Sequence, residues 1–275
     1  MGLTAQILNK LRIQRALPPP QIEGLEQETI QRGSRYGDGH VISIFPNDVA
    51  LADEGSLFVA STAPGQAALQ AGIFAAFSAL TPQFVVYNGD TPGPQAKRVM
   101  LRKLKLRVLT VGTSGVDFGY AVLLDPIARI PSTLSPTQGF GPGTAGANTG
   151  YRAFAMPCNS DQNNLPVGQV YFTFGTTGAT GGMTVPAASA NMRVIVGNGF
   201  LKSTALVAKD VVTLMFGSAD DGGVVQGASA SAHVVDTAPP VIIGAGHTAL
   251  IYLWSTSNIT AGNAFDDAQL VFAER

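Results

Sequence analysis

The sequence predicts an all-β protein: a jelly-roll-like β-sandwich with an extended N-terminal arm that carries a short helix. Short apolar runs rich in Val, Ile, Phe and Tyr recur along most of the chain. Turn signals such as "NGD", "TPGP" and "ADDGG" separate these runs. No segment after Leu51 shows a sustained helical period. Eight or more strands with long, uneven connections fit a jelly roll better than an immunoglobulin-like sandwich.

Residues 1–50 form the predicted arm. Its first turns carry one apolar helical stripe, made of Leu3, Ile7, Leu8 and Leu11. The prolines at 18–20 end this helix, because proline lacks the N–H group and disfavours helical backbone before it. From Gln21 to about Asp53 the apolar residues are isolated, so we expect an arm without a core of its own. The stripe therefore predicts a contact with a neighbouring subunit.

Residues 51–275 form the predicted sandwich domain. The expected strands are Leu57–Ser61, Ile73–Phe77, Phe84–Tyr87, Val99–Val111, Tyr120–Leu124, Val170–Phe174, Met192–Phe200, Val211–Phe216, His233–Val235, Ala249–Trp254 and Leu270–Phe272. One connection, about 126–168, is too long for a hairpin, and such excursions are usually functional or contact loops.

The composition favours association with other chains. Charged residues make up only 13% of the sequence and the net charge is -1, so charge repulsion does little to keep copies apart. The single cysteine, Cys158, excludes a disulfide within the chain. We find no apolar run of membrane-spanning length and no secretory signal, and we therefore expect a soluble protein made in the cytosol.

No motif in the sequence indicates an enzyme. The histidines His40, His233 and His247 have no close partner, and the residues after His247 do not match the His-x-His pair of a cupin metal site. Cys158 has no adjacent base, and no G-x-S-x-G elbow occurs. Asp220-Asp221 and Asp266-Asp267 fit solvated turns better than calcium sites. We expect no catalytic residue, no cofactor and no metal.

The strand Ala249–Trp254 is apolar on both faces, whereas a surface strand normally alternates apolar and polar residues. One face carries Leu250, Tyr252 and Trp254. A neighbouring subunit is one possible cover for this face, since obligate interfaces are apolar. Burial in the core is a second possibility, and a sugar-stacking platform built on Trp254, as in lectin-like jelly rolls, is a third.

A basic segment, "KRVMLRKLKLRVLTV", contains six of the 17 basic residues between Lys97 and Arg107, with no acid among them. Lys103, Lys105 and Arg107 alternate with apolar residues, which predicts a half-buried strand with a basic outer face. Nucleic acid is one possible partner. The chain is slightly acidic and the segment has no interleaved aromatic residues for base stacking, so contact with an acidic protein surface is favoured.

Four stretches resemble those of structural proteins encoded beside capsid genes in double-stranded DNA bacteriophages. They are "DEGSLFVASTAPGQAALQA", "FVVYN", "KRVMLRKLKLRV" and "PPVIIGAGHTALIYLWSTSNITAGNAFDDAQLVFAER". The resemblance covers most of residues 53–275. It implies a virion component that binds capsid proteins: a decoration or cement protein, or a minor capsid protein, with a jelly-roll fold and a homotrimeric state. A major jelly-roll capsid subunit and a carbohydrate- or receptor-binding virion module are the alternatives.

Overall fold

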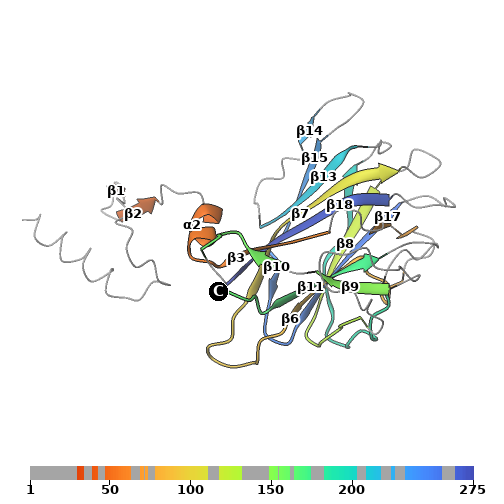
Figure 1. Cartoon of the computed structure of the whole chain (residues 1–275), viewed down its shortest axis with the longest axis horizontal. Helices are drawn as coiled ribbons and strands as arrows, with labels where there is room; N and C mark the ends of the chain where they lie inside the picture. Colours follow the sequence, from red (N-terminus) through yellow and green to blue (C-terminus); the bar gives the residue numbers. More distant parts are fainter. Residues whose placement is uncertain are drawn as a thin grey trace, which may run out of the picture.

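The computed structural model describes the strands and most of their connections (Figure 1). The described residues are 30–33, 39–42, 47–62, 69–70, 72–73, 78–110, 118–131, 149–153, 155–161, 164–174, 183–202, 209–217, 224–226, 233–255 and 264–275. Their elements, in chain order, are β1 (Ile30–Gly33), β2 (Gly39–Ile42), α2 (Asn47–Asp53), β3 (Leu57–Ser61), β4 (Leu69–Gln70), β5 (Gly72–Ile73), β6 (Phe84–Asn88), β7 (Val99–Thr110), β8 (Phe118–Asp125), β9 (Thr149–Ala153), β10 (Ala155–Pro157), β11 (Gly168–Phe174), β12 (Arg193–Lys202), β13 (Val211–Phe216), β14 (Val224–Gln226), β15 (His233–Ala238), β16 (Ile242–Ile243), β17 (Thr248–Ser255) and β18 (Ala264–Glu274).

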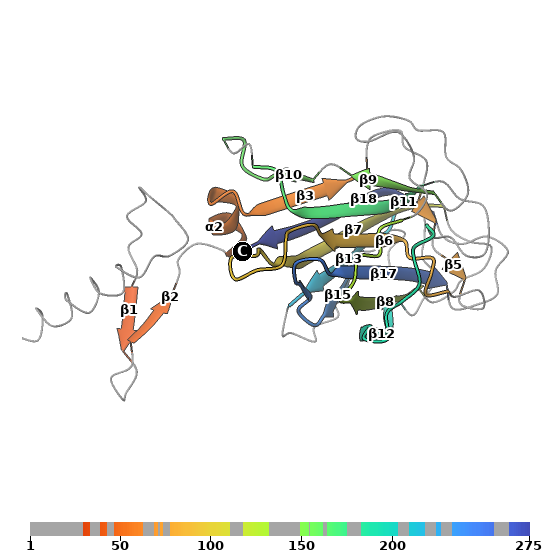
Figure 2. The ribbon, with the colours of Figure 1, turned by 90° about the horizontal axis from the view of Figure 1, so that it is seen from below.

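Two sheets pack face to face and confirm the predicted all-β jelly-roll sandwich. Within the described residues, the larger sheet has nine strands in the order β10-β3-β18-β7-β13-β15-β14, with β16 and β4 beside that path. The smaller sheet has seven, in the order β12-β8-β17-β6-β11-β9, with β5 beside it. Figure 2 shows β17, β6 and β11 lying alongside one another in the smaller sheet.

Eight of these strands form the jelly roll itself: β3, β6, β7, β8, β12, β13, β17 and β18. Numbered one to eight in chain order, they lie as 1-8-3-6 in the larger sheet and 5-4-7-2 in the smaller one. Every pairing among them is antiparallel. A long ribbon that pairs strands 1:8, 2:7, 3:6 and 4:5 produces this order when it wraps around itself, which is the double Greek key of a jelly roll.

The long connection at about 126–168 lies at the tip of this ribbon, between β8 and β12. We expected it to be a loop, and this is wrong for part of it. β9 adds to the edge of the smaller sheet through β11, while β10 pairs with β3 in the larger sheet. The two strands are only five and three residues long and lie in a segment rich in Gly and Pro, so their pairing with existing sheet edges decides that they are strands.

The main core fills the space between the sheets. Phe58 and Phe272 of the larger sheet stack with ring centroids 5.6 Å apart, and Phe84 and Phe172 of the smaller sheet meet edge to face at 5.2 Å. All four rings are at most 2% exposed. Aromatic pairs of this geometry stabilise a core beyond the area that they bury.

A buried carboxylate joins the two sheets near their rim. The Glu274 side chain at the end of β18 accepts a hydrogen bond from the Gly168 N–H group at 2.8 Å, where β11 begins. The Lys97 ammonium lies 3.7 Å from the other carboxylate oxygen. Burial raises the pKa of Glu274 above its usual range, and these two partners lower the pKa only in part.

The predicted strands agree with the observed ones. β3 and β13 have the predicted bounds, and the other expected strands overlap observed ones with ends that differ by up to six residues. Of the expected strand Ile73–Phe77, only Ile73 lies within the described residues. The helix α2 is an element that the sequence did not predict, and it crosses the expected boundary between arm and domain at residue 50. Leu51 of α2 packs on Leu57 and Ala273, so this part of the chain belongs to the domain.

The predicted arm helix lies outside the described residues, and with it Leu3, Ile7, Leu8 and Leu11. Further along the arm, β1 and β2 form an antiparallel hairpin that pairs Ile30 with Ile42. The arm therefore contains a strand pair where the sequence predicts no element. Figures 1 and 2 both show this hairpin beyond the α2 end of the sandwich and apart from it.

Candidate functional site

The second face of β17 is covered by the chain itself. Leu250, Tyr252 and Trp254 are 0%, 2% and 3% exposed in a single copy. They form a second apolar core with other residues of the smaller sheet and with residues 183–192: Val85, Ala121, Leu123, Tyr171, Met183 and Val185. The prediction that a neighbouring subunit covers these three side chains is therefore wrong. The physical reason is that the chain supplies a third layer outside the smaller sheet.

Residues 183–192, which we call the strap, make up this third layer before β12 begins. The Met183 and Val185 N–H groups donate to the carbonyls of Pro82 and Leu80, at 3.1 and 2.9 Å. Met183 and Val185 are 0% and 3% exposed, while most of the residues that follow them face solvent. Two apolar side chains and a few backbone hydrogen bonds thus complete the second core.

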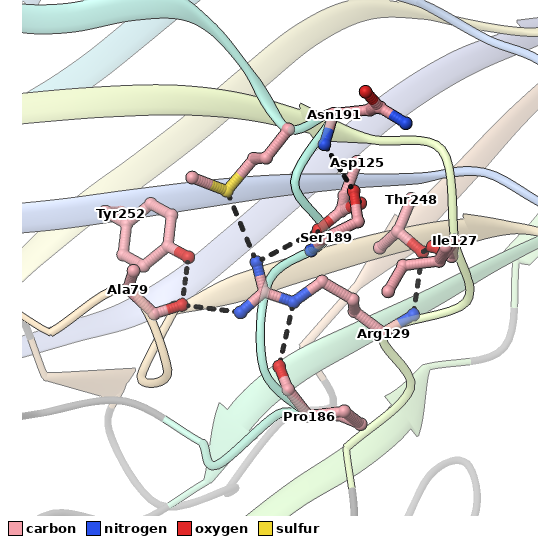
Figure 3. A network of polar contacts seen from close by, with 10 residues as sticks. Ala79, Asp125, Ile127, Arg129, Pro186, Ser189, Asn191, Thr248 and Tyr252 are labelled. Atoms are coloured by element: carbon pink, nitrogen blue, oxygen red, sulfur yellow. Dashed lines mark hydrogen bonds and ion pairs between the residues drawn. The ribbon is translucent and has the colours of Figure 1, made fainter.

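A buried arginine anchors the strap (Figure 3). Arg129 is 0% exposed; its Nε donates to the Pro186 carbonyl at 2.9 Å and its Nη2 to the Ala79 carbonyl at 2.8 Å. Its Nη1 lies 3.6 Å from Asp125 Oδ2 and 3.6 Å from the Met192 sulfur. The guanidinium group therefore connects Pro186 and Met192 of the strap to Ala79, in the loop before β6, and to Asp125, at the end of β8.

The carboxylate of Asp125 is equally buried and holds the middle of the strap. It accepts hydrogen bonds from the Ser189 hydroxyl at 2.5 Å and from the Ser189 N–H group at 3.0 Å. Thr248 of β17 accepts from the Arg129 N–H group and donates to the Ile127 carbonyl, at 3.0 and 2.8 Å (Figure 3). Each of these buried polar groups has partners, as a structural network requires.

The same network involves the phenol of Tyr252. Its hydroxyl donates to the Ala79 carbonyl at 2.7 Å, and burial raises the pKa of Tyr252 to about 12. Trp254 lies in the same core, so it is not a sugar-stacking platform. The network is a structural clamp, and we assign it no chemistry.

The surface that the sequence did identify is the outer side of the larger sheet. Leu104, Leu106 and Val108 of β7 are buried in the main core, whereas Lys103 and Lys105 between them are partly exposed and Arg107 is exposed. The predicted half-buried strand with a basic outer face is confirmed. Since β7 is a central strand, these basic side chains stand in the middle of the sheet and not at its edge.

The neighbours of these lysines follow from the strand register, because directly opposed residues share a face. Lys103 lies between Val271 of β18 and Met215 of β13, and Lys105 lies between Gln269 and Thr213. Arg107 is opposite Asp267. We call this surface the open face; it comprises Val59, Lys103, Lys105, Arg107, Met215, Asp267, Gln269 and Val271, whereas Thr213 on the same side is only 4% exposed.

The open face is a mixed surface on which three partly exposed apolar side chains stand beside Lys103 and Lys105. Val59, Val271 and Met215 are partly exposed, and Met156 of β10, opposite Val59, is 54% exposed. Within the described residues, no ion pair forms at Lys103 or Lys105. Single exposed apolar residues are ordinary, but Met156, Val59 and Val271 adjoin one another across three strands and stand beside two central lysines, a pattern typical of an interaction surface.

The helix α2 covers one end of this face. Asp48 accepts hydrogen bonds from the Arg102 Nε and Nη2 atoms, at 3.1 and 2.6 Å. Arg102 is an extra residue in β7, since the register with β18 shifts between Val271 and Phe272. This bulge allows the Arg102 guanidinium to bond Asp48 of the helix. The helix α2, through which the chain enters the domain, therefore lies close to Lys103.

The remaining candidate residues do not assemble into a chemical site. Within the described ranges, no group of three His, Cys, Asp or Glu residues could hold a metal ion. Cys158 is exposed as a residue, but its thiol is partly desolvated. This desolvation is the main cause that raises the pKa of the thiol, and the negative charge of Asp48 is the second; a raised pKa disfavours a reactive thiolate. His247 lies exposed in the turn before β17.

Comparisons with protein-family models, with curated proteins and with solved structures find no match to this chain. In the part of the chain that the structure describes, no helix has the length and apolar character needed to span a bilayer.

The residues of the clamp were not identified from the sequence. "LLDPIAR" has no recognisable motif, and its partners at Ala79, Pro186 and Thr248 are distant in sequence. An isolated arginine in an apolar segment is the only hint that the sequence offers.

Proposed function

We propose that this protein is a non-enzymatic structural component of a bacteriophage virion, which binds neighbouring capsid proteins through the open face. The observation that carries the proposal is the open face itself. It brings the apolar side chains of Val59, Val271 and Met215 beside Lys103 and Lys105, which form no ion pair with any described residue. A jelly-roll sandwich whose sheet remains open on one side is suited to face-to-face association with another subunit.

The resemblance of residues 53–275 to phage structural proteins supports the same function. A jelly roll alone does not, because the fold also occurs in lectins and in cupins. A sugar cannot stack on Trp254 as in lectins, because the indole ring is buried. Protein contact therefore explains the exposed features of the domain better than a carbohydrate partner does.

The structure also changes the basis of the argument for assembly. The surplus of apolar sheet that we inferred from β17 does not reach the surface, because the strap covers it. The apolar side chains that we propose a neighbour buries are those on the larger sheet, where Met156 is 54% exposed and Val59, Val271 and Met215 are partly exposed. We propose a homo-oligomer, with a trimer favoured, that buries this face in a cement or decoration layer or in a shell.

The test is self-association of the full chain. We expect sedimentation velocity and electron microscopy to show a closed oligomer or a shell, and the double substitution Val271→Glu with Met215→Glu to yield monomers with an unchanged circular dichroism spectrum. Val194→Glu is the matched control, because Val194 is 60% exposed and lies on β12 of the other sheet. A wild-type chain that stays monomeric at high concentration contradicts the homo-oligomer.

A further inference from the structure

We infer that the acidic arm segment Ile22–Glu28 of one copy docks on Lys103 and Lys105 of a neighbouring copy's open face. The inference rests on the proposed function, since it needs a second copy, and it names the contact that holds the two copies together. The segment lies outside the described residues, and its amino-acid sequence complements the surface that receives it.

The segment has the charge and the apolar content that the open face lacks. Glu23, Glu26 and Glu28 place three of the 18 acidic residues within six positions, and no basic residue occurs between Arg15 and Arg32. Ile22 and Leu25 supply aliphatic side chains among these carboxylates. Other acidic residues of the chain occur singly or in pairs.

The receiving surface has the complementary pattern. Lys103 and Lys105 stand on the same side of β7, two residues apart and therefore about 7 Å from each other. Val271 and Met215 flank Lys103 on the two adjacent strands. A segment with carboxylates between aliphatic residues can pair with both lysines and pack on this row at the same time.

The path of the chain points to a neighbouring copy rather than to the same one. The β1–β2 hairpin separates the segment from α2 in the sequence, and it stands beyond the α2 end of the sandwich, apart from the larger sheet of the same copy (Figures 1 and 2). A neighbouring copy that packs at this end brings its open face to the segment, so we assign the contact to two copies.

The experiment uses three full-length variants. The first reverses the receiving surface (Lys103→Glu, Lys105→Glu), the second reverses the segment (Glu23→Lys, Glu26→Lys, Glu28→Lys), and the third carries all five changes. Hydrogen exchange of the peptide that covers the segment and sedimentation velocity are measured for each variant. A matched control, Arg152→Glu with Arg193→Glu, reverses two exposed basic residues on the smaller sheet.

We expect the segment to be protected in the wild type and in the control, and protection to fall about 5- to 30-fold in the first two variants, as the loss of a few exposed ion pairs implies. The variant with all five changes regains protection. Mixing the first two variants also restores it, because the intact segment of the one meets the intact open face of the other. Sodium chloride at high concentration reduces protection.

Three results would overturn the inference. Equal protection of the segment in all variants shows that its contact does not depend on these charges. Loss of protection in the control shows that the effect does not depend on the position of the reversed charges on the open face. Protection that never returns on mixing, although the variant with five changes regains it, places the contact within one copy. An oligomer that persists in every variant overturns this contact and leaves the proposed function standing, whereas a monomeric wild type contradicts both.

Discussion

The clamp at Arg129 allows a quantitative test of how the second core is completed. In Arg129→Ala, the Pro186 carbonyl loses its Arg129 donor, the Ala79 carbonyl keeps only the Tyr252 hydroxyl, and the Asp125 carboxylate stays buried without its cation. Breaking a buried pair by removing one partner costs about 3–5 kcal/mol. We expect the free energy of unfolding, measured by urea titration, to fall by that amount.

A second variant separates the buried charge from the packing of the strap. Arg129→Met with Asp125→Asn leaves no unpaired charge, so we expect a loss smaller than that of Arg129→Ala by about 1 kcal/mol or more. Arg193→Ala, at an exposed position on β12, should change stability by less than about 0.5 kcal/mol. An Arg129→Ala variant that is less than about 1 kcal/mol below the wild type refutes the reasoning.

Three further predictions follow from buried groups. Because burial raises the pKa of Glu274 in the folded state, the wild type loses stability relative to Glu274→Gln as the pH rises from 4.5 through the raised pKa; a wild type that gains stability relative to the variant over this range contradicts this. Trp254→Ala should lower the free energy of unfolding by about 3–5 kcal/mol but leave the sedimenting species unchanged, as denaturation and centrifugation can check. Gly199→Ala should destabilise the fold, because a Cβ atom there would overlap the Tyr120 ring, and equal melting temperatures would speak against this.

Much of the fold could be predicted because the strands have a strong local pattern. β7 alternates basic and apolar residues, and β13 and β17 are short runs of β-branched and aromatic residues. Such patterns depend on burial of one or both faces, and they are visible in a single sequence. The basic outer face of β7 was predicted for the same reason.

The cover of β17 could not be predicted, because nothing in the strand shows what lies on its second face. Apart from Met183, Val185 and Met192, the strap consists of small residues and one proline, so it does not look like a core segment. The groups that fix it, Asp125 and Arg129, act through partners brought together only by the wrapped ribbon. The apolar sequence of β17 therefore predicted correctly that both of its faces are buried, but the cover of the second face was wrongly assigned to a neighbouring subunit.

Minor elements were missed for a related reason. β9 and β10 form because sheet edges are available to them, and α2 forms where Leu51 meets the end of β18 and Asp48 meets Arg102. Tertiary contacts of this kind override weak local preferences.

The central claim is that the open face of the larger sheet meets another copy of the chain. Cross-linking a mixture of isotope-labelled and unlabelled copies at lysine tests it most directly. We predict mixed-isotope links from Lys103 and Lys105, and far fewer from Lys209, which is exposed in the turn before β13. Links from Lys103 and Lys105 that join only residues within one copy would contradict the claim.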